Sequence, residues 1–131
     1  MSLKNKLKNI KIPGMFIYSF PIFCIFTIVL LAYWPGILVS DSMVQWNQTQ
    51  TWVFDDWHPA YNTIYIAFLT KIWNNPGFVL WVQCLWMSLA IGYFFDRINK
   101  HYNVNKYFLI AMCVIFAIIP LNFNFAVTLL K

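Results

Sequence analysis

Three long apolar runs without a charged residue constrain this chain more than any other feature. The first lies between Lys11 and Asp41, the second between Lys71 and Asp96, and the third between Lys106 and Lys131. A helix that crosses a bilayer needs about 20 mostly apolar residues, and each run can hold one. Only 10% of the residues are charged, whereas soluble domains average roughly 25%. We therefore expect an all-α membrane protein with about three transmembrane helices.

The charged residues between the runs predict the orientation of the chain. Four lysines precede the first run, and the segment 96–106 carries three basic residues against Asp96. Under the positive-inside rule both segments face the cytoplasm. The first apolar core, 15–34, is longer than the roughly 7–15 residues of a cleaved signal, so we expect an uncleaved anchor. The chain is thus predicted to be integral to the cytoplasmic membrane, with its aspartate-rich loop outside.

We expect a single membrane domain, 1–131. Its parts are a basic cytoplasmic N-terminus (1–14), a first span (15–34), an outer loop (35–75), a second span (76–95), a cytoplasmic loop (96–106) and a third span (107–125).

The outer loop is expected to contain two helices that lie at the membrane surface. In the stretch 60–73, apolar residues recur at helical spacing, from Tyr61 and Ile64 to Phe68 and Ile72. A span there would place the basic loop 96–106 outside, so the stretch is better explained by an interfacial helix. A second helix is expected at about 42–52, where Ser42 and Gln45 have capping-box spacing. Its apolar residues Met43, Trp46 and Val53 are expected to face the membrane.

Composition argues against several functions. The net charge of +5 comes from membrane-flanking lysines and not from a basic face on a folded domain, so no nucleic-acid partner is expected. The three cysteines all fall inside apolar runs without metal or redox spacing, which is typical of packing residues. The spans lack the ionisable residues that mark channels and transporters.

Asp41 lies a few residues after the first span, so its backbone is held near the membrane. A carboxylate at this place can act as a general base on an acceptor hydroxyl or amine, or bind a divalent metal through oxygen. It can equally be a helix-start aspartate that complements the helix dipole. The position alone does not separate these interpretations.

Asp55, Asp56 and His58 form a second polar cluster in the same loop, next to Trp57. Two carboxylates and an imidazole can bind a divalent metal, hold a phosphate through a bridging cation, or orient a general base. The alternative is a polar turn between two surface helices. Trp57 and its neighbouring tryptophans can stack on sugars or anchor the loop at the membrane interface.

The order of these features resembles the start of GT-C glycosyltransferases, polytopic membrane enzymes that use lipid-phosphate-linked sugars. It looks most like the bacterial relatives of protein O-mannosyltransferases and aminoarabinose transferases, and similar uncharacterised membrane families. Asp41 matches the early loop aspartate of these proteins, and His58-Pro59 matches their His-Pro element. Ser42 and Ala60 replace a usual glutamate and a usual second proline. The resemblance covers roughly residues 10–125, and its specific part is about residues 34–60.

The resemblance implies an enzyme that moves a sugar from a polyprenyl-phosphate donor to an acceptor outside the membrane. Asp41 would be the catalytic carboxylate. The substrate-binding residues would be Asp55, Asp56, Trp57 and His58, with Asp41, Asp55 and Asp56 as candidate ligands of a divalent metal. GT-C enzymes have many more spans, so the chain is expected to be an N-terminal fragment, inactive alone, whose partner is the missing C-terminal part. The rival interpretation is a small non-catalytic membrane protein, a subunit or an assembly factor.

Overall fold

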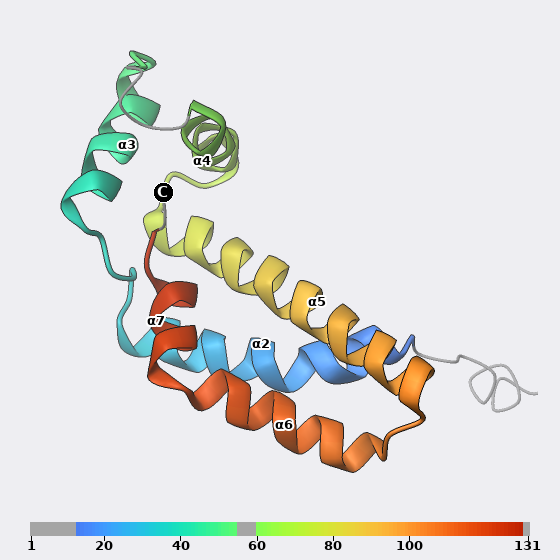
Figure 1. Ribbon diagram of the computed structural model, residues 1–131. Helices are drawn as coiled ribbons and strands as arrows, with labels where there is room; N and C mark the ends of the chain where they lie inside the picture. Colours follow the sequence, from blue (N-terminus) through green and yellow to red (C-terminus); the bar gives the residue numbers. More distant parts are fainter. Residues whose placement is uncertain (1–12, 55–59, 130–131) are drawn as a thin grey trace, which may run out of the picture.

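The computed structural model describes residues 13–54 and 60–129. In this part of the chain the secondary structure is helical apart from one parallel bridge between Ile37 and Thr128. The helices are α2 (Gly14–Ala32), α3 (Ser40–Thr51), α4 (Ala60–Ile72), α5 (Pro76–Tyr102), α6 (Lys106–Ile118) and α7 (Pro120–Val127). Helices α2, α5 and α6 form a bundle, and α3 and α4 lie together at one end of it (Figure 1).

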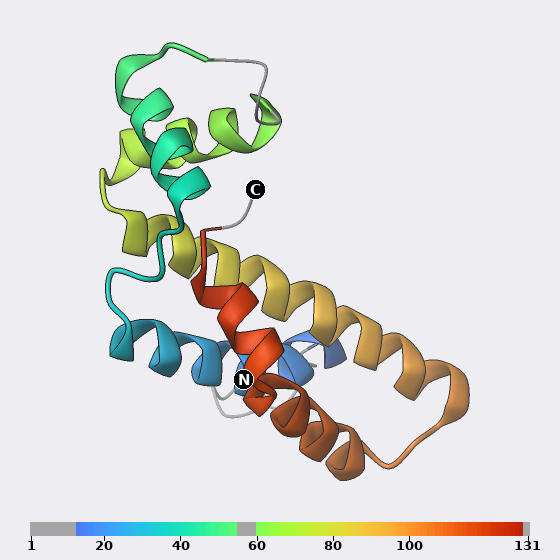
Figure 2. The same ribbon diagram turned by 60° about the vertical axis from the view of Figure 1, so that its left-hand side comes forward.

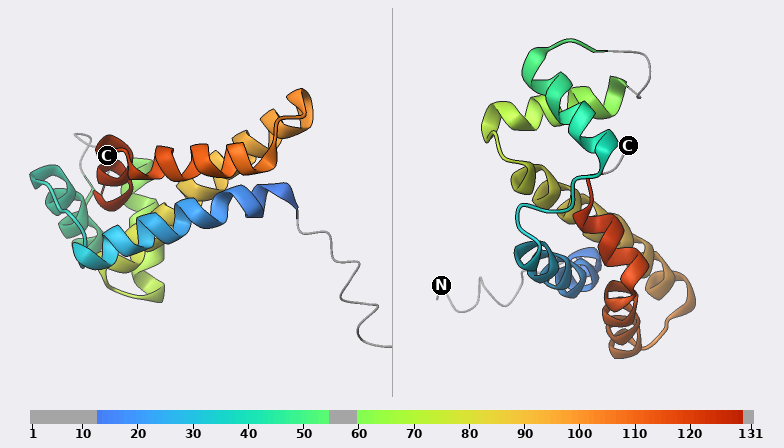
Figure 3. Two further views of the ribbon diagram at one scale, coloured as in Figure 1. Left: turned by 90° about the horizontal axis from the view of Figure 1, so that it is seen from below. Right: turned by 90° about the vertical axis from the view of Figure 1, so that its left-hand side faces the viewer.

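Two of these helices, α2 and α5, are long and apolar enough to cross a membrane. Helices α6 and α7 together could form a third span, but they meet at an angle of 67°. The helical content and the two candidate spans of the described residues agree with the expected all-α membrane protein. Figure 3 shows α2 and α6 running in the same direction and α5 running against them, as successive crossings require.

The expected third span, 107–125, coincides with α6 and α7, which are bent at Pro120. Proline has no backbone N–H, so it cannot bond to the carbonyl four residues earlier, that of Phe116. The side-chain amide of Asn122 donates to this carbonyl over 2.7 Å instead. The freed backbone group is therefore satisfied at the bend, as an apolar environment demands.

The expected cytoplasmic loop, 96–106, is mostly helix, because α5 continues to Tyr102. An ion pair between Lys100 and Asp96, one turn apart at 2.6 Å, supports this extension. Lys100 and His101 in the last turn also complement the negative end of the helix dipole. Asn103, at φ 51°, ends the helix, and Asn105 caps α6 by accepting a hydrogen bond from the backbone of Tyr107.

The core of the bundle is built from residues repeated every four positions. This spacing places them on one ridge of each helix, so the ridges of neighbouring helices can interlock. The buried ridge of α2 is Tyr18, Ile22, Phe26 and Leu30; that of α5 includes Leu80 and Cys84; that of α6 is Leu109, Cys113 and Ala117. Helix α2 thereby packs against both α5 and α6.

The chain that follows α7 returns to the segment that follows α2, and the two lie side by side (Figure 2). The backbone N–H of Ile37 donates to the Val127 carbonyl over 2.9 Å, and that of Leu129 donates to the Ile37 carbonyl over 3.2 Å. Gly36 precedes this contact at φ +110°, where a side chain would also overlap Leu80. The returning segment reaches the base of the layer formed by α3 and α4.

Candidate functional site

Helix α3 buries a stripe of polar residues and exposes two of its apolar residues. The buried residues are Ser42, Gln45, Gln48 and Thr49. On the outside, Met43 is 59% exposed and Val44 is 45% exposed. The outer side also carries exposed polar residues, among them Asn47 and Gln50, so it is mixed, whereas the buried side is polar.

Helix α4 presents the apolar face that its sequence pattern predicts. Tyr61, Ile64, Phe68 and Ile72 are all exposed along one side. Buried Thr63, Ile66 and Leu69 lie on the opposite side, where α4 packs against α3 and α5. Helices α3 and α4 therefore enclose a partly polar interior, and α4 turns an apolar face outward.

Asp41 lies in the first turn of α3 and is half-buried. The predicted capping box was wrong, because α3 begins at Ser40 and the capping position is Val39. The hydroxyl of Ser42 instead donates to the carbonyl of Leu129, which ties the start of α3 to the segment returning from α7. Asp41 thus lies next to a residue that is fixed by tertiary contacts, and its place at a helix start also fits the interpretation as a dipole partner.

One turn further along α3, Gln45 connects this helix to α4. Residues i and i+4 share a helix face, so Gln45 lies on the same side of α3 as Asp41. The side-chain oxygen of Gln45 accepts a hydrogen bond from the Asn62 amide over 3.0 Å. The Gln45 amide nitrogen and the Thr63 hydroxyl, both buried, have no hydrogen-bond partner among the described residues. Since buried polar groups are costly unless paired, this interior is suited to accept further polar atoms.

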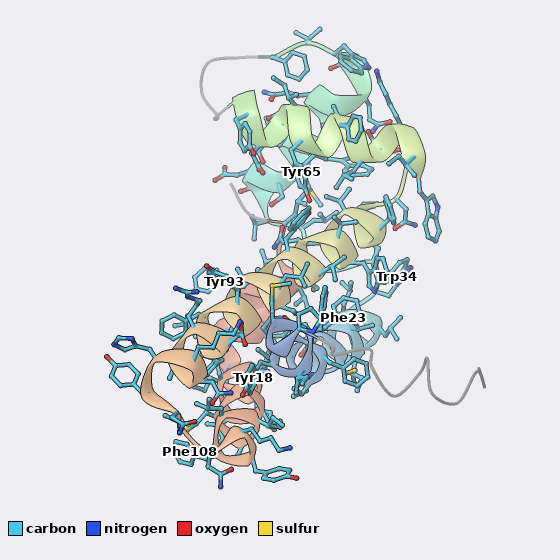
Figure 4. The ribbon with its side chains drawn as sticks, turned by 90° about the vertical axis from the view of Figure 1, so that its right-hand side faces the viewer. Tyr18, Phe23, Trp34, Tyr65, Tyr93 and Phe108 are labelled. Atoms are coloured by element: carbon cyan, nitrogen blue, oxygen red, sulfur yellow. The ribbon has the colours of Figure 1, made fainter. Side chains whose placement is uncertain are left out.

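An open cavity of about 430 Å³ lies beside this interior, between α4 and α5. Its lining residues are Tyr61, Asn62 and Tyr65 of α4 and Gln83, Trp86 and Met87 of α5. Tyr65 lies on the side of α4 that faces α5 (Figure 4). Burial raises the pKa of its hydroxyl, and a hydrogen bond from the Trp86 side chain opposes this rise. Asn62 connects the cavity wall to Gln45, and through α3 to Asp41.

Gln83, on the other wall of the cavity, holds the end of α7. Its amide nitrogen lies 3.1 Å from the Phe125 carbonyl and 3.0 Å from the Thr128 carbonyl. These carbonyls have no partner within a helix that ends here, so the Gln83 amide compensates for them. The cavity is thereby connected to the same returning segment that Ser42 contacts.

Of the residues predicted for the site, Asp41 is the one that lies in the described part of the chain. Asp55, Asp56, Trp57 and His58 lie outside the described residues, so their proximity to Asp41 stays a prediction. Among the residues that the structure describes, no group of three His, Cys, Asp or Glu side chains lies close enough together to hold a metal ion. The suggested metal ligands therefore stay a prediction as well.

The sequence interpretation missed the polar residues that build the interior: Gln45, Asn62, Thr63 and Gln83. A signal for the first of these was present. Ser42, Gln45 and Thr49 recur at positions i, i+3 and i+7, a polar stripe at helical spacing between apolar residues. It is easily taken for a solvated face, and only the packing of α3 shows that it points inward.

Comparison with known protein families, curated proteins and solved structures finds no match to this chain. In the residues that it describes, the structure is that of a helical protein with two candidate membrane-spanning helices and a layer of two short helices over a partly polar interior.

Proposed function

We propose that this chain is the N-terminal module of an integral-membrane glycosyltransferase that uses a polyprenyl-phosphate-linked sugar. The observation that carries the proposal is the layer formed by α3 and α4, which has a polar interior and an apolar outer face on α4, with Asp41 on the face of α3 that Gln45 shares. A lipid-linked sugar also combines a polar part with an apolar part. Its polar head must react at the level where its apolar tail enters the membrane. The interior formed by Gln45, Asn62 and Thr63 would receive the polar head.

In the proposed reaction, an acceptor hydroxyl attacks the anomeric carbon of the sugar. The new C–O bond forms as the bond from that carbon to the phosphate oxygen breaks, and the electron pair leaves with the lipid phosphate. Asp41 takes the proton from the acceptor or orients the hydroxyl for attack, which is general-base catalysis combined with positioning. Attack from the face opposite the phosphate inverts the configuration of the sugar.

Asp55, Asp56, Trp57 and His58 are proposed to bind the donor. The two carboxylates would hold a divalent metal or hydrogen-bond the sugar, and His58 would contact the phosphate. Trp57 would stack on the sugar ring. The module is proposed to lie in the cytoplasmic membrane with its N-terminus inside, which puts α3 and α4 at the outer surface, where lipid and acceptor meet.

The test is the substitution Asp41→Asn in the protein expressed in its own cells. Isolated membranes would be supplied with radiolabelled polyprenyl-phosphate sugars, and the labelled acceptor would be quantified. We expect transfer to fall by a factor of at least about 100 while the amount of protein is unchanged, which is the order of a lost general base. Asn47→Ala, at an exposed position of the same helix, should leave transfer intact.

Equal transfer by the wild type and by Asp41→Asn would reject the catalytic role of Asp41. Transfer that is absent from wild-type membranes with every donor, together with normal growth of the Asp41→Asn cells, would favour the non-catalytic subunit instead.

A further inference from the structure

We infer that the basic end of the bundle binds one anionic phospholipid, with its phosphate on Arg97 and His101 and an acyl chain between α5 and α6. This site lies at the opposite end of the bundle from α3 and α4, and it does not depend on the proposed transferase activity. Two adjoining cavities of opposite chemistry carry the inference.

The first cavity is an apolar groove of about 280 Å³ between α5 and α6. Its walls are Ala90, Ile91, Phe94 and Phe95 of α5 and Phe116 of α6. All five side chains are apolar, and Phe94 is 59% exposed. Inside a membrane, such a groove is filled by hydrocarbon, and aromatic walls fit a flexible acyl chain.

The second cavity, of about 300 Å³, is lined by Arg97, Lys100 and His101. Lys100 is partly neutralised, because its ammonium group lies 2.6 Å from the carboxylate of Asp96. Asp96 is itself buried against the start of α2, where a methyl group on Gly14 would overlap it. Arg97 and His101 are both exposed. Arginine offers a fork of N–H donors that matches phosphate oxygens, and imidazole offers at least one N–H.

The two cavities follow one another along a single face of α5. Ala90, Phe94, Arg97 and His101 stand at positions i, i+4, i+7 and i+11, so they form one continuous stripe. At a rise of about 1.5 Å per residue, the basic groups lie about 4 to 10 Å beyond Phe94 along the axis. The stripe changes from apolar to basic where α5 leaves its apolar run. This is the level at which lipid headgroups lie, and basic pockets there bind anionic headgroups.

The basic groups alone could bind any phosphate, but the groove selects a lipid. A soluble phosphate would occupy the second cavity and leave the apolar groove without a role. A zwitterionic phospholipid would fill the groove, but its own ammonium group would weaken the attraction to Arg97. An anionic phospholipid satisfies both cavities together.

The inference can be tested by native mass spectrometry of the full chain in detergent. Delipidated protein would be titrated with phosphatidylglycerol or with phosphatidylcholine of the same acyl chains. We expect one phosphatidylglycerol to bind at least about fivefold more tightly than phosphatidylcholine, since a basic group at the membrane surface contributes roughly that factor. Arg97→Gln should lose about fivefold in phosphatidylglycerol affinity, and Arg97→Gln combined with His101→Gln should lose more.

Lys106→Gln is the matched control, because it removes a positive charge at the same end but outside both cavities. The affinity of this variant for phosphatidylglycerol should equal that of the wild type. Phe94→Ala should weaken phosphatidylglycerol binding through the groove. All the substituted side chains are exposed, so the variants should keep the fold. The comparison of the two lipids on the wild-type protein does not depend on any variant.

Three results would overturn the inference. One is equal affinity of the wild type for the two lipids. Another is a loss on Lys106→Gln as large as that on Arg97→Gln. The third is displacement of phosphatidylglycerol by inorganic phosphate at equal concentration, which would show a simple anion site.

Discussion

The contact between α2 and α5 at Gly92 leads to the sharpest stability prediction. A methyl group at Gly92 would overlap the hydroxyl oxygen of Ser19, and it would lie 2.7 Å from both the Met15 carbonyl oxygen and the Ser19 backbone nitrogen. Two of these three neighbours are backbone atoms, which no side-chain rotation can move. Small residues permit this close approach of helices in membrane proteins.

Gly92→Ala should therefore push the two helices apart. Overpacking of this kind costs about 1 to 3 kcal/mol. Replacing glycine by alanine inside a helix stabilises the helix by up to about 1 kcal/mol, which offsets part of this cost. Because two of the three contacts are with backbone atoms, the overpacking cost lies in the upper part of its range, about 2 to 3 kcal/mol. We therefore expect a net loss of about 1 to 2 kcal/mol in the free energy of unfolding, or a melting temperature lower by roughly 3 to 8 °C.

The cysteines of the chain provide the assay. Cys84 and Cys113 are both fully buried, so a thiol-reactive fluorescent dye labels them only as the bundle opens. Heating the purified protein with the dye gives the melting temperature directly. Cys24 is partly exposed and contributes the signal before the transition.

Ala111→Leu is the control, because it enlarges a side chain on the exposed side of α6. Its melting temperature should stay within about 2 °C of the wild type, as surface changes cost little. A Gly92→Ala protein that melts at or above the wild-type temperature would refute the close α2–α5 contact and the packing derived from it.

Two further predictions follow from the fold. Gln83→Glu should lower the melting temperature by roughly 3 to 10 °C, because an amide donor that serves the carbonyls at the end of α7 becomes an acceptor; an unchanged value in the same dye assay would show that this contact is unimportant. For the orientation, single cysteines at Asn47 and Asn103 on a cysteine-free background should differ, with an impermeant reagent labelling Asn47→Cys in intact cells and Asn103→Cys only after lysis. The reverse pattern would invert the proposed topology.

The helical class and the bounds of the first span could be read from the chain with little error. An uncharged run of about 20 apolar residues has few alternatives, because a lipid environment requires the backbone groups to bond within the segment. The expected 15–34 and the observed Gly14–Ala32 agree closely. Both helices expected in the loop 35–75 are present as α3 and α4. For α4 the signal was the apolar stripe from Tyr61 to Ile72, which recurs at helical spacing; the location of both helices at the membrane surface stays a prediction.

The ends of α5 and α6 were harder to predict, for local reasons. The charged residues after Phe95 were interpreted as a loop, although they continue the helix through the ion pair between Asp96 and Lys100. In the third apolar run, hydropathy does not indicate where the helix bends. Pro120 marked the place, but the angle depends on Asn122 and on the packing of α7 against α5 and α2.

Sequence by itself determined the two candidate membrane-spanning helices, α2 and α5, and the candidate carboxylate Asp41, because hydropathy and charge act through the solvent that each segment meets. Tertiary structure alone decided that the polar stripe of α3 points inward, that Gln45 meets Asn62, and that residues after α7 hold the start of α3. These are contacts between segments far apart in the chain. They follow from how three helices pack. The local residue pattern does not determine which helix faces this packing buries.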